Sequence, residues 1–204
     1  MQLGVGLVEL PFMSTRAILP VKLSLTEGDF YTLWAPTWKE HGSEWQAFLG
    51  DDDSVLAFHS PEELLVFLNS TSRHDLSDHP KWAAFQAQGD DRVAPDEKQH
   101  YDIVGAPAYL TGRPSHDNVS ALSRVFQLSR SLADVANAEH AQIFFASHSI
   151  LNNVARGSEH YAGENGLDEW SGVGRVVLSN WKDVVRDLDA AVRVVDTSQF
   201  DPSA

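Results

Sequence analysis

Cysteine is absent from this 204-residue chain. A disulfide framework, a thiol nucleophile, an iron–sulfur cluster and a cysteine-ligated zinc site are therefore excluded, and a reducing cytoplasm is the expected compartment. Long apolar runs are also missing, because no stretch reaches the roughly 18 residues that a membrane-spanning helix needs. We therefore expect a cytoplasmic protein with no membrane partner.

Basic residues are scarce. The chain has 15 Lys and Arg against 29 Asp and Glu, a formal charge of −14, and its basic residues are scattered singly. A phosphate backbone is repelled by such a chain, which argues against direct nucleic-acid binding. The alternative is an acidic DNA mimic, which would carry carboxylates spaced along one face. The acidic residues of this chain are dispersed instead, as in proteins whose surface charge keeps them soluble.

The composition is that of a folded protein, with 43% hydrophobic and 10% aromatic residues. The first twelve residues are apolar, but they lack a basic start and contain Glu9, so they do not match a signal peptide. We expect a flexible arm or a start-site extension over residues 1–20, with either Met1 or Met13 as the true start.

The remaining chain is expected to form one globular unit. Its parts would be an α+β core over 21–110, a helical part packed on the same core over 111–196, and a tail over 197–204. Strands first and helices later predict an α+β fold, in which a small antiparallel sheet is covered on one face by helices.

Alternating apolar residues predict strands over 21–25 and 30–35, the second ended by Pro36. Two apolar runs, 44–50 and 55–59, flank a polar turn and predict a hairpin. We expect one further strand near residues 100–110.

Helix signals are clearest where capping residues precede apolar periodicity. Ser60, Pro61 and Glu63 predict a helix start with a capping box. Ser115 is expected to cap a long helix. Residues 142–147 fit either a short helix or a strand.

The C-terminal part carries apolar residues at alternating steps of three and four over 167–195. They are Leu167, Trp170, Gly174, Val177, Trp181, Val184, Leu188, Ala191 and Val195. Further valines beside this seam make it broader than a strict coiled-coil stripe, which favours a helix packed on its own domain. A homodimer through this helix is the alternative.

Three tryptophans lie within twelve positions, at Trp34, Trp38 and Trp45. Side chains alternate along a strand, and both faces of residues 30–34 are apolar, which predicts a strand covered on both sides. Trp45, Ala47 and Leu49 show the same alternation on the next strand. We therefore expect at least two of the three tryptophans to lie in the core. The alternative is a ligand or partner contact at Trp38 and His41, together with Trp34.

One cluster could hold a metal ion: His74, Asp75, Asp78 and His79 lie within six residues. Imidazole and carboxylate suit zinc, iron or manganese. Asp78, however, precedes a predicted helix start, where a carboxylate commonly caps free N–H groups. Pro80 also disfavours helical geometry at His79. We expect no cofactor and no catalytic residue.

The segment "LSLTEGDFYTLWAPTWKEHGSEWQAFLGDDDSVLAFHSPEELLVFL", followed by "HDLSDHPKW", resembles a family of uncharacterised actinobacterial cytosolic proteins. Members are sometimes automatically labelled "primosomal protein". The resemblance covers roughly residues 20–85, with a weaker match in "GLDEWSGVGRVVLSNWKDVV". It implies a soluble bacterial protein and supplies no catalytic residues. Any replication role would act through protein partners.

These observations favour a non-catalytic interaction or scaffold protein with an unidentified protein partner, because no catalytic motif stands out. Two alternatives stay open. One is a small metal-dependent hydrolase that uses the 74–79 cluster with His59 or Asp53. The other is the acidic DNA mimic.

Overall fold

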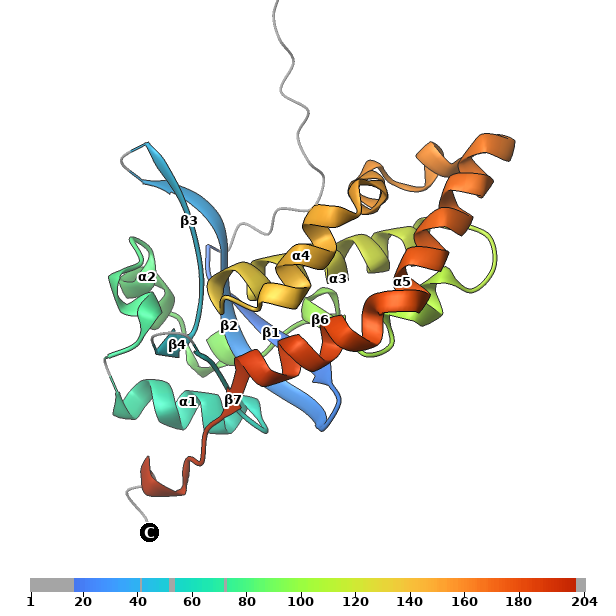
Figure 1. The fold of residues 1–204 in the computed structure, drawn as a ribbon. Coiled ribbons are helices and arrows are strands. Elements are labelled where there is room, and N and C mark those ends of the chain that lie inside the picture. The colour runs from blue at the N-terminus through green and yellow to red at the C-terminus, as the bar shows by residue number, and fades with distance from the viewer. Residues whose placement is uncertain (1–16, 41, 52–53, 72, 201–204) are drawn as a thin grey trace, which may run out of the picture.

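The computed structural model describes residues 17–40, 42–51, 54–71 and 73–200. Within these ranges seven strands are present: β1 (Leu19–Leu25), β2 (Gly28–Glu40), β3 (Ser43–Phe48), β4 (Gly50–Asp51), β5 (Ser54–Ala57), β6 (His100–Asp102) and β7 (Val192–Val194). The α-helices are α1 (Pro61–Ser70), α2 (Trp82–Gln86), α3 (His116–Val135), α4 (Glu139–Ser147) and α5 (Gly163–Ala191). Short 3-10 helices connect them. The α+β class is thus confirmed (Figure 1).

The strands form two small sheets, in the orders β3-β2-β1-β6 and β4-β5-β7. The pairs β1–β2, β2–β3 and β4–β5 are antiparallel, whereas β6 joins β1 and β7 joins β5 in parallel. An antiparallel bridge between Tyr31 and Phe58 connects the sheets, with N···O distances of 2.8 and 3.0 Å. The expected antiparallel sheet is therefore a mixed one.

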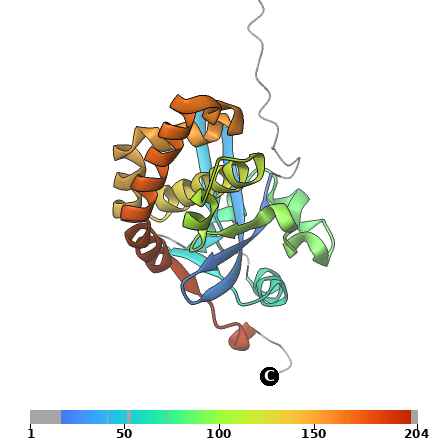
Figure 2. The same cartoon turned by 90° about the vertical axis from the view of Figure 1, so that its right-hand side faces the viewer.

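Helices cover both faces of the sheets, not one. In Figure 2 the strands lie between α3, α4 and α5 on one side and α1 with the residues around α2 on the other. A larger apolar cluster, the helical-face core, includes Phe30 and Trp34 of β2. A smaller one, the second core, includes Leu33 and Ala35 of the same strand. The prediction that 30–35 is covered on both sides is confirmed.

Pro36 does not end its strand. The strand β2 continues to Glu40, and its pairing with β3 shifts register between Ala35 and Trp38. A proline lacks an N–H for the ladder, so a strand tolerates it at such an irregularity.

Two predicted helix starts are confirmed. Ser60 Oγ accepts a hydrogen bond from Glu63 N at 3.2 Å, while the Glu63 carboxylate accepts from His59 N at 3.1 Å. Ser115 Oγ accepts from Asn118 N at 3.2 Å and caps the 20-residue α3. Side-chain acceptors satisfy N–H groups that the first helical turn leaves unpaired.

The seam of α5 lies in the helical-face core of its own chain. Trp170, Val177, Trp181, Val184 and Leu188 are all buried. These are the side chains that the homodimer alternative would use, so a dimer would have to engage other residues of α5. None of the helices within the described parts of residues 17–200 is long and apolar enough to span a bilayer.

The first and last described residues pack against the folded core. The strand β1 begins at Leu19, within the arm expected over 1–20, and Ile18 is already buried. Near the other end, the ring of Phe200 meets Phe67 of α1 edge-on, with centroids 5.7 Å apart. Met1 and Met13 lie outside the described residues.

Candidate functional site

The three tryptophans of residues 34–45 have different surroundings. Trp34 is buried in the helical-face core, where it stacks on Phe48 with centroids 6.0 Å apart. Trp38 is half-buried against the second core. Trp45, directly opposite Trp38 on β3, is 55% exposed. Trp34 is therefore structural, and the exposed indole is Trp45, which the alternation pattern had placed inside.

Trp38 packs on the 74–79 segment. Its ring meets the ring of His79 edge-on at 4.4 Å, and its indole N–H is buried without a hydrogen-bond partner. His41, the other predicted contact residue, lies outside the described residues. The structure thus places Trp38 in a packed contact, with only part of its surface open to a partner.

The predicted metal cluster forms a capped turn beside the second core. Asp75 to Asp78 make one 3-10 helix, His74 N donates to Ser77 Oγ at 3.2 Å, and Leu76 is fully buried. Across the described residues, no three or more His, Asp or Glu side chains converge as metal ligands. His59, the proposed additional ligand, is exposed, and Asp53 lies outside the described residues.

His74 is the titratable group of this turn that burial affects most clearly. It is 9% exposed, and its ring meets Trp82 edge-on at 4.5 Å. Burial lowers the pKa of His74, because the charged form loses hydration. The neutral imidazole of His74 packs on the indole of Trp82 and thereby joins this turn to α2.

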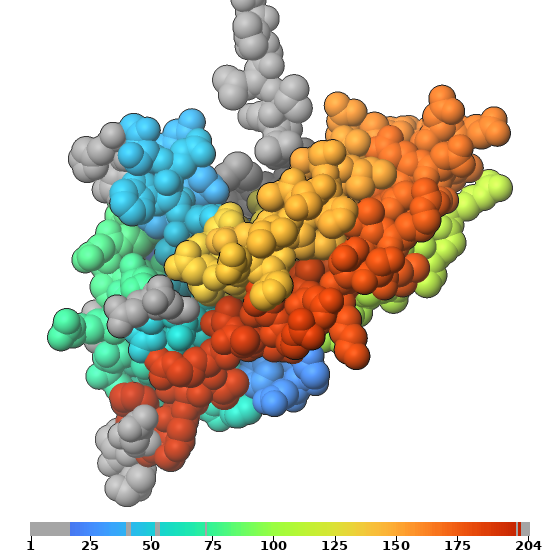
Figure 3. All heavy atoms as spheres, in the orientation of Figure 1, coloured from blue at the N-terminus to red at the C-terminus, as the bar shows by residue number. Residues whose placement is uncertain are grey.

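The outer face of the helical layer exposes large apolar side chains. Ile143 of α4 is 54% exposed and Leu178 of α5 is 71% exposed. The two helices lie side by side (Figure 3). Asp187 is an α5 residue that contacts α4, and Leu178, nine residues before it and thus half a turn around the helix, projects from the side of α5 that points away from α4. On their inner sides, Phe144 and Trp181 meet at 5.9 Å, so the helices are fixed relative to each other. We call the solvent-exposed sides of α4 and α5 that carry these two separate side chains, Ile143 and Leu178, the α4/α5 outer face.

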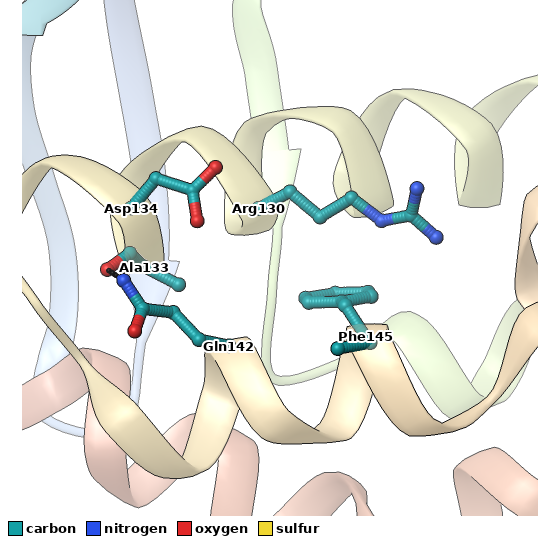
Figure 4. Close-up of a pocket in the computed structure, with 6 residues that line it drawn as sticks. Arg130, Ala133, Asp134, Gln142 and Phe145 are labelled. Atoms are coloured by element: carbon teal, nitrogen blue, oxygen red, sulfur yellow. Dashed lines mark hydrogen bonds between the residues drawn. The ribbon is translucent and has the colours of Figure 1, made fainter.

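A hollow with a cavity volume of about 240 Å³ lies between α3 and α4. The residues that line this α3–α4 hollow are Arg130, Ala133, Asp134, Gln142, Phe145 and Ala146 (Figure 4). Gln142 Nε2 donates to Ala133 O at 3.0 Å and connects the two walls. The guanidinium carbon of Arg130 lies 4.8 Å from the centre of the Phe145 ring, a cation–π geometry.

A polar network ties the 3-10 segments after α4 to α5. Glu169 Oε1 contacts His160 Nε2 at 2.9 Å and accepts from Asn153 Nδ2 at 2.6 Å. The contact with His160 lowers the pKa of the Glu169 carboxyl. Nearby, burial raises the pKa of Tyr161, whose hydroxyl has no hydrogen-bond partner. The network connects α5 to two 3-10 segments, which indicates a structural clamp.

Sequence reasoning did not single out Ile143, Leu178 or Arg130. A signal existed for Leu178, because a leucine next to the seam position Val177 falls on the polar side of an amphipathic helix. No comparable signal existed for Arg130, because its burial and its contact with Phe145 of α4 arise from tertiary packing.

The family model for the SatS C-terminal domain matches residues 18–189. This chain belongs to the SatS C-terminal domain family. Among solved structures, a similar one is entitled "The crystal structure of SatS c-terminal domain in complex with bromine". It is 16% identical, its TM-score is 0.58, and the match covers 88% of this chain and 94% of that one. This similarity shows a shared fold. Comparison with curated proteins gives no match.

Proposed function

We propose that this member of the SatS C-terminal domain family is a non-catalytic protein-interaction module that binds a partner through the α4/α5 outer face. The observation that carries the proposal is the exposure of Leu178, 71%, and Ile143, 54%, on two helices whose inner sides are firmly packed. Apolar side chains held out by a rigid frame lose little conformational entropy on binding, which favours association.

The proposal includes a cytoplasmic location and an actinobacterial origin, as the sequence predicts. An actinobacterial cytoplasmic protein is consistent with a chain without cysteine. A role in replication, which the label "primosomal protein" implies, would run through protein partners, because the net charge of −14 opposes direct contact with DNA.

The test is affinity capture from the host with matched variants. Ile143→Ser combined with Leu178→Ser should reduce recovery of the specific partner about tenfold, as expected when two apolar anchors are removed. Val104→Ser is the control, because Val104 is 43% exposed but lies in the turn after β6. Recovery of the same proteins at the same level by both variants would contradict the proposal.

The metal-dependent hydrolase is tested by metal analysis of the purified protein. Stoichiometric zinc, iron or manganese that disappears in His74→Ala would establish this alternative and displace the interaction module. The acidic DNA mimic predicts salt-sensitive competition with DNA for a basic partner.

A further inference from the structure

The α3–α4 hollow contains an arginine with unused hydrogen-bonding capacity. Nε and Nη2 of Arg130 are buried, and neither has a hydrogen-bond partner. Buried polar groups in folded proteins are nearly always paired, and guanidinium groups especially so. An arginine left in this condition marks a position where a partner atom is missing.

The two unpaired nitrogens define one edge of the guanidinium. The N–H bonds of Nε and Nη2 point outward from the same side of the planar group and run nearly parallel. This fork matches the spacing of the two oxygens of a carboxylate, which bind as two parallel hydrogen bonds. The edge therefore has the geometry of a bidentate carboxylate receptor.

The neighbours of Arg130 do not fill this role. Asp134, one turn further along α3, is the carboxylate that lines the same hollow, yet its Oδ2 accepts from Gln46 Nε2 at 3.4 Å. In Figure 4 the Arg130 guanidinium extends away from Asp134 to the far end of the hollow, above the Phe145 ring. Phe145 contacts the guanidinium through its ring face and offers no acceptor for an in-plane N–H group.

Burial makes the charge of Arg130 costly. Desolvation lowers the pKa of Arg130, and the nearby charge of Asp134 offsets this effect only in part. An incoming anion would therefore relieve two deficits at once, the unpaired donors and the poorly solvated charge.

We propose that Arg130 binds a carboxylate group of a ligand that enters the α3–α4 hollow. Because Nε and Nη2 are shielded in this structure, binding requires the stem of Arg130 to turn the Nε–Nη2 edge toward the hollow while the Phe145 ring still supports the guanidinium. The ligand is a monoanion, because Asp134 and the net charge of −14 oppose a dianion such as phosphate. The carboxylate belongs either to a free small acid or to a side chain of a bound peptide. The site goes beyond the proposed partner binding, because a free acid would also occupy it.

The direct test follows the Arg130 Nε–H resonance by NMR in the ¹⁵N-labelled full chain. One arm adds sodium acetate. The other adds the blocked peptide acetyl-Ala-Ala-Glu-Ala-Ala-amide, with its glutamine counterpart as a control. Sodium chloride at equal ionic strength is the reference in both arms. We expect a saturable shift of the Arg130 resonance with acetate, with the glutamate peptide, or with both.

Variants distinguish recognition by the two-donor Nε–Nη2 edge of Arg130 from attraction by its positive charge alone. Arg130→Lys keeps the charge and the aliphatic stem but loses the two-donor edge, so the affinity for the carboxylate should fall about tenfold. Asp134→Asn removes the competing charge from the hollow and should strengthen binding about threefold. Arg186→Gln removes the same charge from an exposed position on α5, where Arg186 pairs with Asp183, and should change nothing. For the variants, binding is followed by backbone amide shifts in α3 and α4.

The outcomes are separable. Saturation by acetate identifies a site for a free acid, whereas saturation by the glutamate peptide alone identifies a peptide side-chain site; both support the proposal. It is overturned if chloride produces the same shift, if no probe produces one, or if Arg130→Lys and Arg186→Gln bind as the parent chain does. None of these results depends on Ile143 or Leu178, so the proposed partner surface stands or falls separately.

Discussion

The two faces of the sheet are covered by different kinds of structure. On one face α3, α4 and α5, of 20, 9 and 29 residues, pack into the helical-face core. On the other, the second core lies under the ten-residue α1, the five-residue α2 and several 3-10 turns. Long helices satisfy most of their backbone groups internally, whereas short segments leave many to be satisfied by side chains.

This difference accounts for the histidines and the arginine buried beside the second core. His79 Nδ1 accepts from Lys81 N at 3.0 Å, and Arg92 Nη1 donates to Gly89 O at 3.3 Å, both beside the second core. His74, whose backbone N–H is bound by Ser77, lies there as well. Buried polar groups on this face hold irregular backbone in place, so they are not evidence of catalysis.

The largest expected effect is on the helical-face core. Trp181 packs on Phe126, Phe144 and Phe145, and its Nε1 donates to Ile103 O at 2.7 Å. Trp181→Ala should lower the free energy of unfolding by about 3–5 kcal/mol, measured by urea denaturation. Trp181→Phe, which keeps a ring but leaves the Ile103 carbonyl unpaired, should cost about 1–3 kcal/mol. Equal costs would show that the hydrogen bond, and not the packing, dominates.

A smaller effect is expected at the second core. Leu64 is fully buried, and Leu64→Ala should cost about 2–5 kcal/mol. Because α1 and α2 are short, we expect native-state hydrogen exchange to accelerate in these helices while amides of α5 stay protected. Leu64→Met, of similar volume, is the control and should cost less than about 1.5 kcal/mol. Acceleration to the same extent in α5 would show that both faces unfold as one unit and would break the comparison.

The smallest effect concerns pH. Burial lowers the pKa of His74 from its ordinary value of 6.5, so below that pH the unfolded chain binds a proton that the folded chain does not. The stability due to neutral His74 is fully present above pH 6.5 and is lost as the pH falls through the lower, folded-state pKa. His74→Phe, which keeps a ring against Trp82, should reduce the decline of the urea midpoint as the pH falls below 6.5.

The matched variant is His116→Gln, because His116 is exposed at the start of α3. It should leave the decline with pH unchanged. An unaltered decline in His74→Phe would mean that other groups govern the acid sensitivity of this face.

Short sequence patterns were sufficient to predict several secondary-structure elements correctly. Ser60 and Ser115 cap helices as predicted, since a capping bond depends on residues only three positions apart. The apolar residues on both sides of β2 correctly predicted two cores. The sequence predicted helices that start at Ser60 and after Asp78, but not that they cover the second face of the sheets, because the face that a helix covers is set by contacts between distant segments.

The candidate sites were harder to predict. Trp45 alternates like a core residue but is exposed, because β3 is an edge strand that pairs only with β2 in its sheet. The 74–79 segment has the residue types of a metal site, yet its histidine rings pack on Trp38 and Trp82. Residue type indicated possible chemistry, and packing decided whether the side chains were available for it.

The sequence alone determined the acidic character, the absence of thiol chemistry, the helix caps and the buried stripe of α5, because each depends on composition or on residues a few positions apart. Tertiary structure decided the parallel pairing of β6 and β7, the exposure of Leu178 and the unpaired edge of Arg130. These features arise where segments distant in the chain meet, and the solvent and hydrogen-bond partners of a side chain are set only by that meeting.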